Sequence, residues 1–222
     1  MKIDILTLFP SMFDAFLKTS IIGRAVANKQ VVINVHNIRD YSPYPRGQVD
    51  DYGYGGGRGM VLMPEPIFNA IEALKTKESL VIMMTPQGIP YQQKKAYELS
   101  KEKHLIIICG HYEGFDERIR SIVDLEISIG DYILTGGEIP SMVIVDSVVR
   151  LLDGVIEKES HLNESFNNSL LDYPVYTKPQ EFRGMKVPDV LLSGHHENIK
   201  KWRKEQALKK TREKRPDLLE KS

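Results

Sequence analysis

The sequence has only one cysteine, Cys109, among its 222 residues. A single cysteine cannot form a disulfide within the chain. Disulfides are common in secreted proteins and rare in the reducing cytosol. The cysteine content therefore favours a cytoplasmic setting.

Long hydrophobic runs are also missing. No apolar stretch approaches the roughly 18 residues that a membrane-spanning helix needs. Near the N-terminus, Asp4 interrupts the apolar residues that a signal peptide would keep continuous. We therefore expect no membrane partner. The chain is 41% hydrophobic and 27% charged, which is typical of an ordinary globular protein.

Net charge is absent as well, since 30 basic side chains balance 30 acidic ones. The balance conceals an uneven distribution. Residues 183–222 hold 12 Lys and Arg against 6 Asp and Glu, a net charge of +6, so residues 1–182 carry −6. A basic C-terminal segment is typical of a phosphate-rich partner, although a solvated helix face is an equally reasonable interpretation.

Short apolar runs alternate with amphipathic stretches along the first 150 residues. Strands are predicted at 3–8, 31–35, 80–84, 105–109 and 122–129, and helices at 64–74, 92–100 and 138–152. Each of the last three strands runs into a Gly-containing loop. This order predicts an α/β fold with a mainly parallel sheet, whose ligands bind beyond the carboxyl ends of the strands.

The remaining segments predict a second, smaller region. Residues 39–59 read as a loop, and 155–170 as a polar linker. A basic helix is predicted at 198–214. We therefore expect a catalytic domain at 1–160, a flexible linker at 161–172 and a small α-helical domain at 173–222.

The glycine-rich loops do not match common phosphate-binding motifs. Residues 53–59 contain no Gly-Lys-Ser/Thr, and the later loops contain no G-x-G-x-x-G. They offer backbone N–H and C=O groups between apolar side chains, which suits an uncharged planar group such as adenine. Simple tight turns are the alternative. Thr135 and Glu138 also fit a capping box for the helix that follows.

Six ordered motifs extend over nearly the whole chain. They are Leu8-Phe-Pro-x-Met-Phe13, Val49-Asp-Asp-x-x-Tyr-Gly-Gly-Gly-x-Gly-Met60, Pro86-Gln-Gly88, Cys109-Gly-His-Tyr-Glu-Gly-x-Asp-Glu-Arg118, Ser128-Ile-Gly-Asp-Tyr-x-Leu-x-Gly-Gly-Glu138 and Val190-Leu-Leu-Ser-Gly-His195. With these motifs the sequence closely resembles bacterial tRNA (guanine-N1)-methyltransferases, which methylate guanosine 37, the nucleotide 3′ of the anticodon. This resemblance implies a trefoil-knotted SPOUT methyltransferase domain, S-adenosylmethionine as methyl donor and an obligate homodimer with shared sites. Periodicity alone would not predict a knot.

The resemblance also assigns a cofactor-binding set from the three loops. The first and second loops contribute one residue each, and the third loop contributes the other eight. The implied S-adenosylmethionine-binding residues are Pro86, Gly110, Ile129, Gly130, Asp131, Tyr132, Ile133, Leu134, Gly136 and Gly137.

Methylation of guanine N1 requires a base for the N1 proton and a cation for the charge that develops on O6. By resemblance, Arg150 is the cation, although Asp146 and Arg150 also have the spacing of a helix salt bridge. Glu164 stands where the family has an aspartate before Ser-Phe, and is the implied base. Asp172 matches a second family acid and could share or replace that role.

The resemblance further implies a Mg²⁺ ion and contacts to the tRNA anticodon stem-loop. Glu113, Glu164 and Asp172 are the candidate Mg²⁺ ligands, and Glu113 also belongs to the substrate set. Asp50 and Asp51 are expected to close the guanine pocket, while Lys209 and Lys210 contact phosphates. Two alternatives stay open: a related knotted methyltransferase acting on another RNA position, and a non-catalytic RNA-binding relative.

Overall fold

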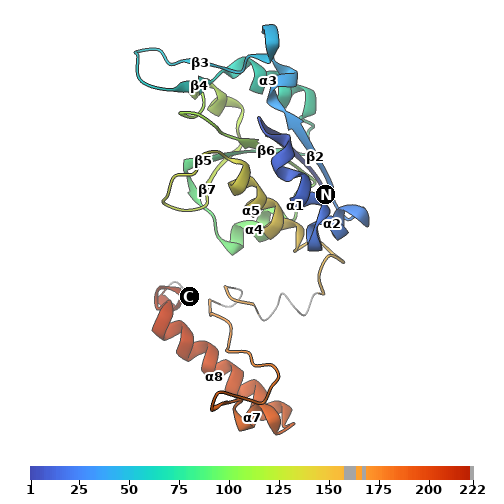
Figure 1. Ribbon diagram of the computed structural model, residues 1–222, viewed down its shortest axis with the longest axis vertical. Coiled ribbons are helices and arrows are strands. Elements are labelled where there is room, and N and C mark those ends of the chain that lie inside the picture. The colour runs from blue at the N-terminus through green and yellow to red at the C-terminus, as the bar shows by residue number, and fades with distance from the viewer. Residues whose placement is uncertain (158–163, 167–168, 221–222) are drawn as a thin grey trace. The chain divides into compact units, whose positions relative to one another are not determined.

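The computed structural model describes residues 1–157, 164–166 and 169–220. The chain divides into two compact units, Met1–Ile156 and Glu157–Ser222. Figure 1 shows the helices and strands of each unit. Within the described residues, no helix combines the length and the apolar character needed to cross a membrane.

The N-terminal unit is built on a five-stranded sheet in the order β2-β1-β6-β5-β7. Every pair of neighbouring strands is parallel, so the predicted α/β class with a parallel sheet is confirmed. The strands are β1 (Lys2–Thr7), β2 (Val32–Asn37), β5 (Ser79–Pro90), β6 (His104–Cys109) and β7 (Leu125–Ser128).

Helices cover both faces of this sheet, as Figure 1 shows. Side chains alternate along each strand, so in β6 Ile107 faces one core and Ile106 the other. The first core packs against η1 (Pro10–Phe13), α1 (Asp14–Lys18), α2 (Ser20–Ala27), α4 (Gln93–Leu99) and α5 (Glu138–Val149). The second core packs against η2 (Ile38–Tyr41), α3 (Pro64–Leu74) and η4 (Glu117–Ile122).

Strand β5 differs from the prediction that it would end at Met84. It continues to Pro90, and its pairing with β7 shifts register between Met84 and Ile89, both of which pair with Ile127. Residues 85–88 therefore form a bulge at the carboxyl edge of the sheet. The proline and glycine in this stretch lie within the bulge, and parallel pairing with β7 resumes beyond it.

The predicted loop at 39–59 contains ordered structure. After η2 come η3 (Pro45–Gly47) and β3 (Asp50–Tyr52), which pairs antiparallel with β4 (Met60–Leu62). The prediction of a loop is therefore wrong for the two strands of this hairpin. The glycine-rich connection at 53–59 contains turns and bends, as the sequence indicates.

The C-terminal unit is dominated by α8 (His196–Lys214), preceded by α7 (Asp189–Leu192) and followed by α9 (Asp217–Glu220). A short hairpin joins β8 (Glu181–Phe182) to β9 (Met185–Lys186). The predicted linker range 161–172 lies partly outside the described residues. In its described part, the Leu171 N–H donates to Thr211 Oγ1 of α8 at 2.8 Å, and Thr211 is fully buried.

Candidate active site

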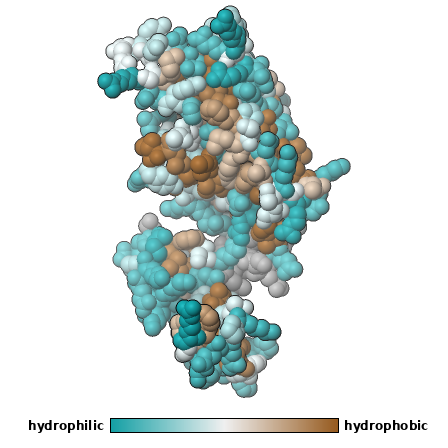
Figure 2. Space-filling model, in the orientation of Figure 1, coloured by the Kyte–Doolittle hydropathy of each residue, from teal (hydrophilic) through white to brown (hydrophobic). Residues whose placement is uncertain are grey.

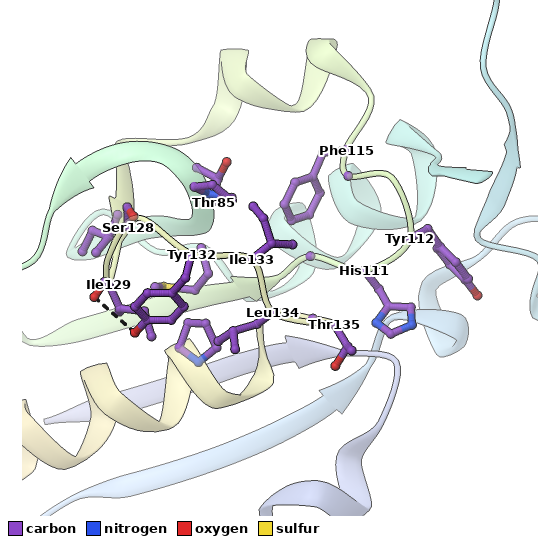
Figure 3. A pocket seen from close by; sticks show the side chains of 18 of the residues that line it. Thr85, His111, Tyr112, Phe115, Ser128, Ile129, Tyr132, Ile133, Leu134 and Thr135 are labelled. Atoms are coloured by element: carbon purple, nitrogen blue, oxygen red, sulfur yellow. Dashed lines mark hydrogen bonds between the residues drawn. The ribbon is translucent and has the colours of Figure 1, made fainter. Parts of the chain in front are cut away.

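A pocket of about 320 Å³ lies at the carboxyl edge of the sheet, where β5, β6 and β7 end. Figure 3 shows side chains from the three loops arranged around it. Nine of the ten predicted cofactor residues line this pocket: Pro86, Gly110, Ile129, Gly130, Tyr132, Ile133, Leu134, Gly136 and Gly137. The parallel sheet therefore gathers residues that are 51 positions apart in the sequence.

The third loop returns to the second at Gly137. The Gly137 N–H donates to the Gly110 carbonyl at 2.7 Å. A Cβ at Gly137 would lie 2.6 Å from the Gly110 backbone nitrogen and 2.7 Å from Cys109 Cα. No side chain fits at such distances, because both neighbours are backbone atoms. Glycine at 137 is thus required for the loop closure that forms the pocket floor.

The pocket walls are apolar and partly open to solvent. Ile133 is 80% exposed and Tyr132 is 55% exposed, so both present apolar surface that a ligand could cover. The Tyr132 hydroxyl donates to the Ile129 carbonyl at 3.4 Å, and Figure 3 shows this contact. Such a wall suits a planar apolar ligand that approaches backbone polar groups.

One buried polar atom in the pocket lacks a partner. Within the described residues, Nδ1 of His111 makes no hydrogen bond although it is buried. The ring lies between Phe9 and Tyr112, with centroid distances of 4.9 and 4.8 Å. A buried imidazole nitrogen without a partner is costly, so this corner favours a ligand with a complementary polar group. The pocket thus fits a cofactor that combines apolar and polar parts.

Asp131 is the predicted cofactor residue that does not line the pocket. It is exposed, so its carboxylate faces solvent rather than the wall. Conversely, motif reading missed several lining residues that lie beside the loop glycines. Tyr112 is one of them, and its φ of 58° is rare for a non-glycine residue. The others include Met84, Thr85, His111, Phe115, Ser128, Thr135 and Pro140.

The hairpin β3–β4 is attached to the second loop of the pocket. The Glu113 N–H donates to the Met60 carbonyl at 3.0 Å, and the Leu62 N–H donates to the Gly114 carbonyl at 2.9 Å. Glu113 itself lines the pocket. These bonds attach β4 to the second loop of the pocket. Because β3 pairs with β4, Asp50 and Asp51 are attached to that loop as well.

Gly59 is the last residue of the connection between β3 and β4, and it lies against Glu113. Its φ is +87°, and a Cβ there would lie 2.5 Å from Cγ of Glu113. The glycine-rich stretch therefore lets the hairpin pack directly against the Glu113 side chain. Three of the predicted substrate residues, Asp50, Asp51 and Glu113, are thereby brought to one part of the unit.

The predicted capping box at α5 is wrong. Gly137, not Thr135, occupies the N-cap, and no side chain caps the helix. Glu138 is 3% exposed and accepts a hydrogen bond from Thr7 Oγ1 at 2.7 Å. This carboxylate therefore joins α5 to the end of β1, because the tight turn at Gly137 places it beneath the loop and not over the helix terminus.

Arg150 lies at the opposite end of α5 from the pocket. The helix begins directly after Gly137, and Arg150 is its C-cap. At 1.5 Å per residue, twelve residues separate Arg150 from Glu138 by roughly 18 Å. Arg150 is absent from the residues lining the pocket. An arginine side chain cannot span that distance back to the pocket of its own chain.

Glu164 and Asp172 both belong to the C-terminal unit. The Asp172 N–H donates to Ser165 Oγ at 2.9 Å, so the residue next to Glu164 contacts Asp172. The Tyr173 N–H donates to Asp172 Oδ1 at 2.8 Å. The fold of this unit therefore brings the two candidate bases into one neighbourhood. Lys209 and Lys210 lie on α8 of the same unit.

The described residues contain no group of three or more His, Cys, Asp or Glu side chains that could hold a metal ion. Glu113 lies in the N-terminal unit, and Glu164 and Asp172 lie in the other. The candidate Mg²⁺ ligands thus do not form a metal site within either unit.

Comparison with known proteins identifies the family. The family described as tRNA (Guanine-1)-methyltransferase TrmD matches residues 1–221. The chain belongs to this family. Proteins named tRNA (guanine-N(1)-)-methyltransferase from Staphylococcus aureus strains JH9 and Newman are each 58% identical over 224 residues, covering 100% of this chain and 91% of the relative. The predicted resemblance to tRNA (guanine-N1)-methyltransferases is confirmed, and with it the expectation of an enzyme.

Membership of the tRNA (guanine-N1)-methyltransferase family covers both units. The match includes the pocket loops and also the region of Glu164, Asp172 and α8. The full-length match shows that the basic C-terminal unit is part of the same family architecture.

Proposed function

We propose that this enzyme transfers a methyl group from S-adenosylmethionine to N1 of guanosine 37, 3′ of the anticodon in tRNA. The observation that carries this proposal is the convergence of three glycine loops on one pocket, in a chain that the family matches from end to end. Because tRNA is its substrate, the enzyme would act in the cytoplasm.

Nine predicted residues of the pocket would hold the adenosyl group and the methionine portion. When bound, S-adenosylmethionine supplies an electrophilic methyl group. Pro86, Ile133 and Leu134 offer apolar surface for adenine, and the loop backbone offers hydrogen bonds to its edge. Gly136 and Gly137 leave room for the methionine portion against the pocket floor.

Residues from the C-terminal unit would handle the proton. Glu164 would accept the N1 proton of guanine, and Asp172 is the second candidate for this role. Arg150 stabilises the negative charge on O6, which makes proton transfer to a weak carboxylate base favourable. Without that cation, N1 would remain protonated and a poor nucleophile.

The position of Arg150 supports a homodimer with shared sites. Pro140 is the lining residue on α5, and ten residues of helix separate it from Arg150 by roughly 15 Å. The arginine that serves a pocket would therefore come from the second copy. Exposed apolar residues on α5 and the adjoining η1 support such an interface, since Ile139 is 49% exposed, Val143 40% and Met12 45%. Figure 2 shows hydrophobic surface on this unit.

We include the trefoil knot in the proposal. Two contacts support a chain that passes beneath its own loop. The third loop returns to Gly110, and Ser141 packs against Cys109 with Oγ and Sγ 3.0 Å apart.

For the tRNA, Asp50 and Asp51 would border the guanine, and Lys209 and Lys210 would contact phosphates of the anticodon stem-loop. The described residues do not fit a preformed Mg²⁺ site, and no catalytic step is assigned to that ion.

The function is tested by transfer of a labelled methyl group to unmodified tRNA, followed by nucleoside analysis. We expect N1-methylguanosine, and we expect it to disappear when guanosine 37 is replaced by adenosine. A methyl group at another position would instead favour a related knotted methyltransferase. RNA binding without transfer would favour a non-catalytic relative.

A further inference from the structure

A groove of about 500 Å³ lies in the C-terminal unit, apart from the pocket of the N-terminal unit. It is formed by the segment that follows Asp172, by α7 and by one side of α8. Its lining residues include Tyr173, Val175, Tyr176, Lys178, Leu192 and Arg203. None of the steps proposed for methyl transfer uses these side chains.

The groove offers flat aromatic and apolar surface to solvent. Val175 is 76% exposed and Tyr176 is 50% exposed. Tyr176 lies beside Trp202, with ring centroids 6.5 Å apart. Exposed aromatic and apolar side chains that line a groove are a feature of ligand-binding sites. Figure 2 shows hydrophobic patches on this unit amid a largely hydrophilic surface.

Positive charge borders this apolar surface. The guanidinium of Arg203 stacks over the Tyr173 ring at 4.8 Å, and Lys178 also lines the groove. Among the described residues, none that lines the groove is acidic. Helix α8, which forms one wall, carries 8 Lys and Arg against 3 Glu. A ligand for this groove should therefore combine an apolar planar group with negative charge.

We propose that the groove binds one unpaired nucleotide of the tRNA, distinct from the guanosine that is methylated. The base stacks on Tyr176, and its phosphate lies between Arg203 and Lys178. Aromatic side chains beside cations are the usual means by which proteins hold unpaired bases. This inference rests on the proposed function, because a tRNA anticodon loop supplies several unpaired bases next to the target.

The test compares two RNAs with the full-length enzyme: an anticodon stem-loop, and a blunt duplex with the same stem and no unpaired nucleotide. We expect Tyr176→Ala to weaken stem-loop binding roughly tenfold or more and to leave duplex binding unchanged. Tyr176→Trp should restore most of the affinity. Phe182→Ala is the matched control, because Phe182 is an aromatic residue of the same unit, 54% exposed, outside the groove.

A scan of abasic sites through the loop identifies the bound nucleotide. One abasic position should weaken binding to the wild-type enzyme and cause no further loss with Tyr176→Ala, since both changes remove the same contact. Equal losses on stem-loop and duplex, or a changed mass of the assembly in Tyr176→Ala, would overturn the proposal and indicate a packing surface. An enzyme that bound neither RNA would contradict the proposed function itself, whereas normal methyl transfer with an inert groove would contradict only this inference.

Discussion

Gly137 is a motif glycine whose lack of a side chain determines the shape of the pocket. Its nitrogen donates to the Gly110 carbonyl, and a Cβ would overlap the Gly110 backbone. The two loops can approach this closely only because the side chain is absent. The glycine at this position thus has a steric reason that substitution can test.

We expect Gly137→Ala to weaken S-adenosylmethionine binding roughly tenfold or more, because the added methyl group pushes the third loop away from the second. Calorimetric titration of the donor measures this effect. Gly53→Ala is the control, since a Cβ there meets only Val61 Cγ2 at 3.5 Å. An unchanged affinity in Gly137→Ala would mean that the loop closure does not shape the binding site.

The buried carboxylate of Asp4 accepts hydrogen bonds from polar side chains of β1, β2 and β6. Burial alone would raise its pKa, but hydrogen bonds from Lys2, Asn34, His36 and His104 outweigh burial and lower the pKa from 3.8 to about 2. The shortest of these contacts are 2.7 Å. The charged form of Asp4 is therefore bound more strongly in the folded protein than in the unfolded chain.

This shift predicts acid sensitivity with a defined sign. A lowered folded-state pKa stabilises the protein fully above pH 3.8, and the stabilisation, about 2 kcal/mol, is lost as the pH falls towards 2. Urea unfolding at several pH values should show Asp4→Asn less stable than wild type at pH 7, with the difference shrinking between pH 4 and pH 2. A difference that stayed constant over this range would show that the carboxylate charge contributes nothing.

The general base can be assigned by comparing two carboxylates. We expect Glu164→Gln to lower the single-turnover rate of methyl transfer roughly 100-fold or more while donor affinity stays unchanged. Glu164→Asp keeps a carboxylate at this position and should retain activity. If Asp172→Asn causes the larger loss instead, Asp172 is the base.

Substitutions on helix α8 test whether its lysines bind phosphates of the tRNA. Charge reversal in Lys209→Glu/Lys210→Glu should raise the KM for tRNA roughly tenfold or more and flatten its salt dependence, without altering donor affinity. Lys77→Glu/Lys101→Glu is the charge-matched control, because these exposed lysines lie near the amino ends of β5 and β6, away from the pocket. An unchanged KM would make the basic face of α8 a solvated surface only.

The helices and strands with strong local signals were predictable. Helix α3 begins at Pro64 and ends at Leu74 as expected, because a proline opens it and apolar residues recur along one face. Strand β6 was equally clear from its continuous apolar run. In both cases the local sequence and the buried environment favour the same structure.

The hairpin β3–β4 could not be predicted in this way. Its strands are three residues each, and Asp50 and Asp51 have low strand propensity. What fixes them is bonding of β4 to the loop at Glu113 and Gly114, which is distant in sequence. The pocket residue Tyr112 was missed for a related reason, since its wall position depends on an unusual backbone conformation.

For the proposed homodimer, the remoteness of Arg150 from the pocket of its own chain predicts complementation between subunits. Homodimers of Gly137→Val and of Arg150→Ala should both be nearly inactive. A mixed dimer, isolated with two affinity tags, should regain about half the wild-type rate, because one intact pocket receives one intact arginine from the partner. Absence of any recovery would place Arg150 at the pocket of its own chain.

The location of Cys109 makes its thiol an intrinsic reporter of the separation of the pocket floor from α5. This sole cysteine is fully buried where the strand β6 meets the loop and α5, and burial raises the pKa of its thiol. A thiol reagent can therefore modify the native chain only after the pocket floor separates from α5. The rate of labelling would follow that separation directly, and a bound methyl donor that stabilises the closed loops would slow it, with no added probe.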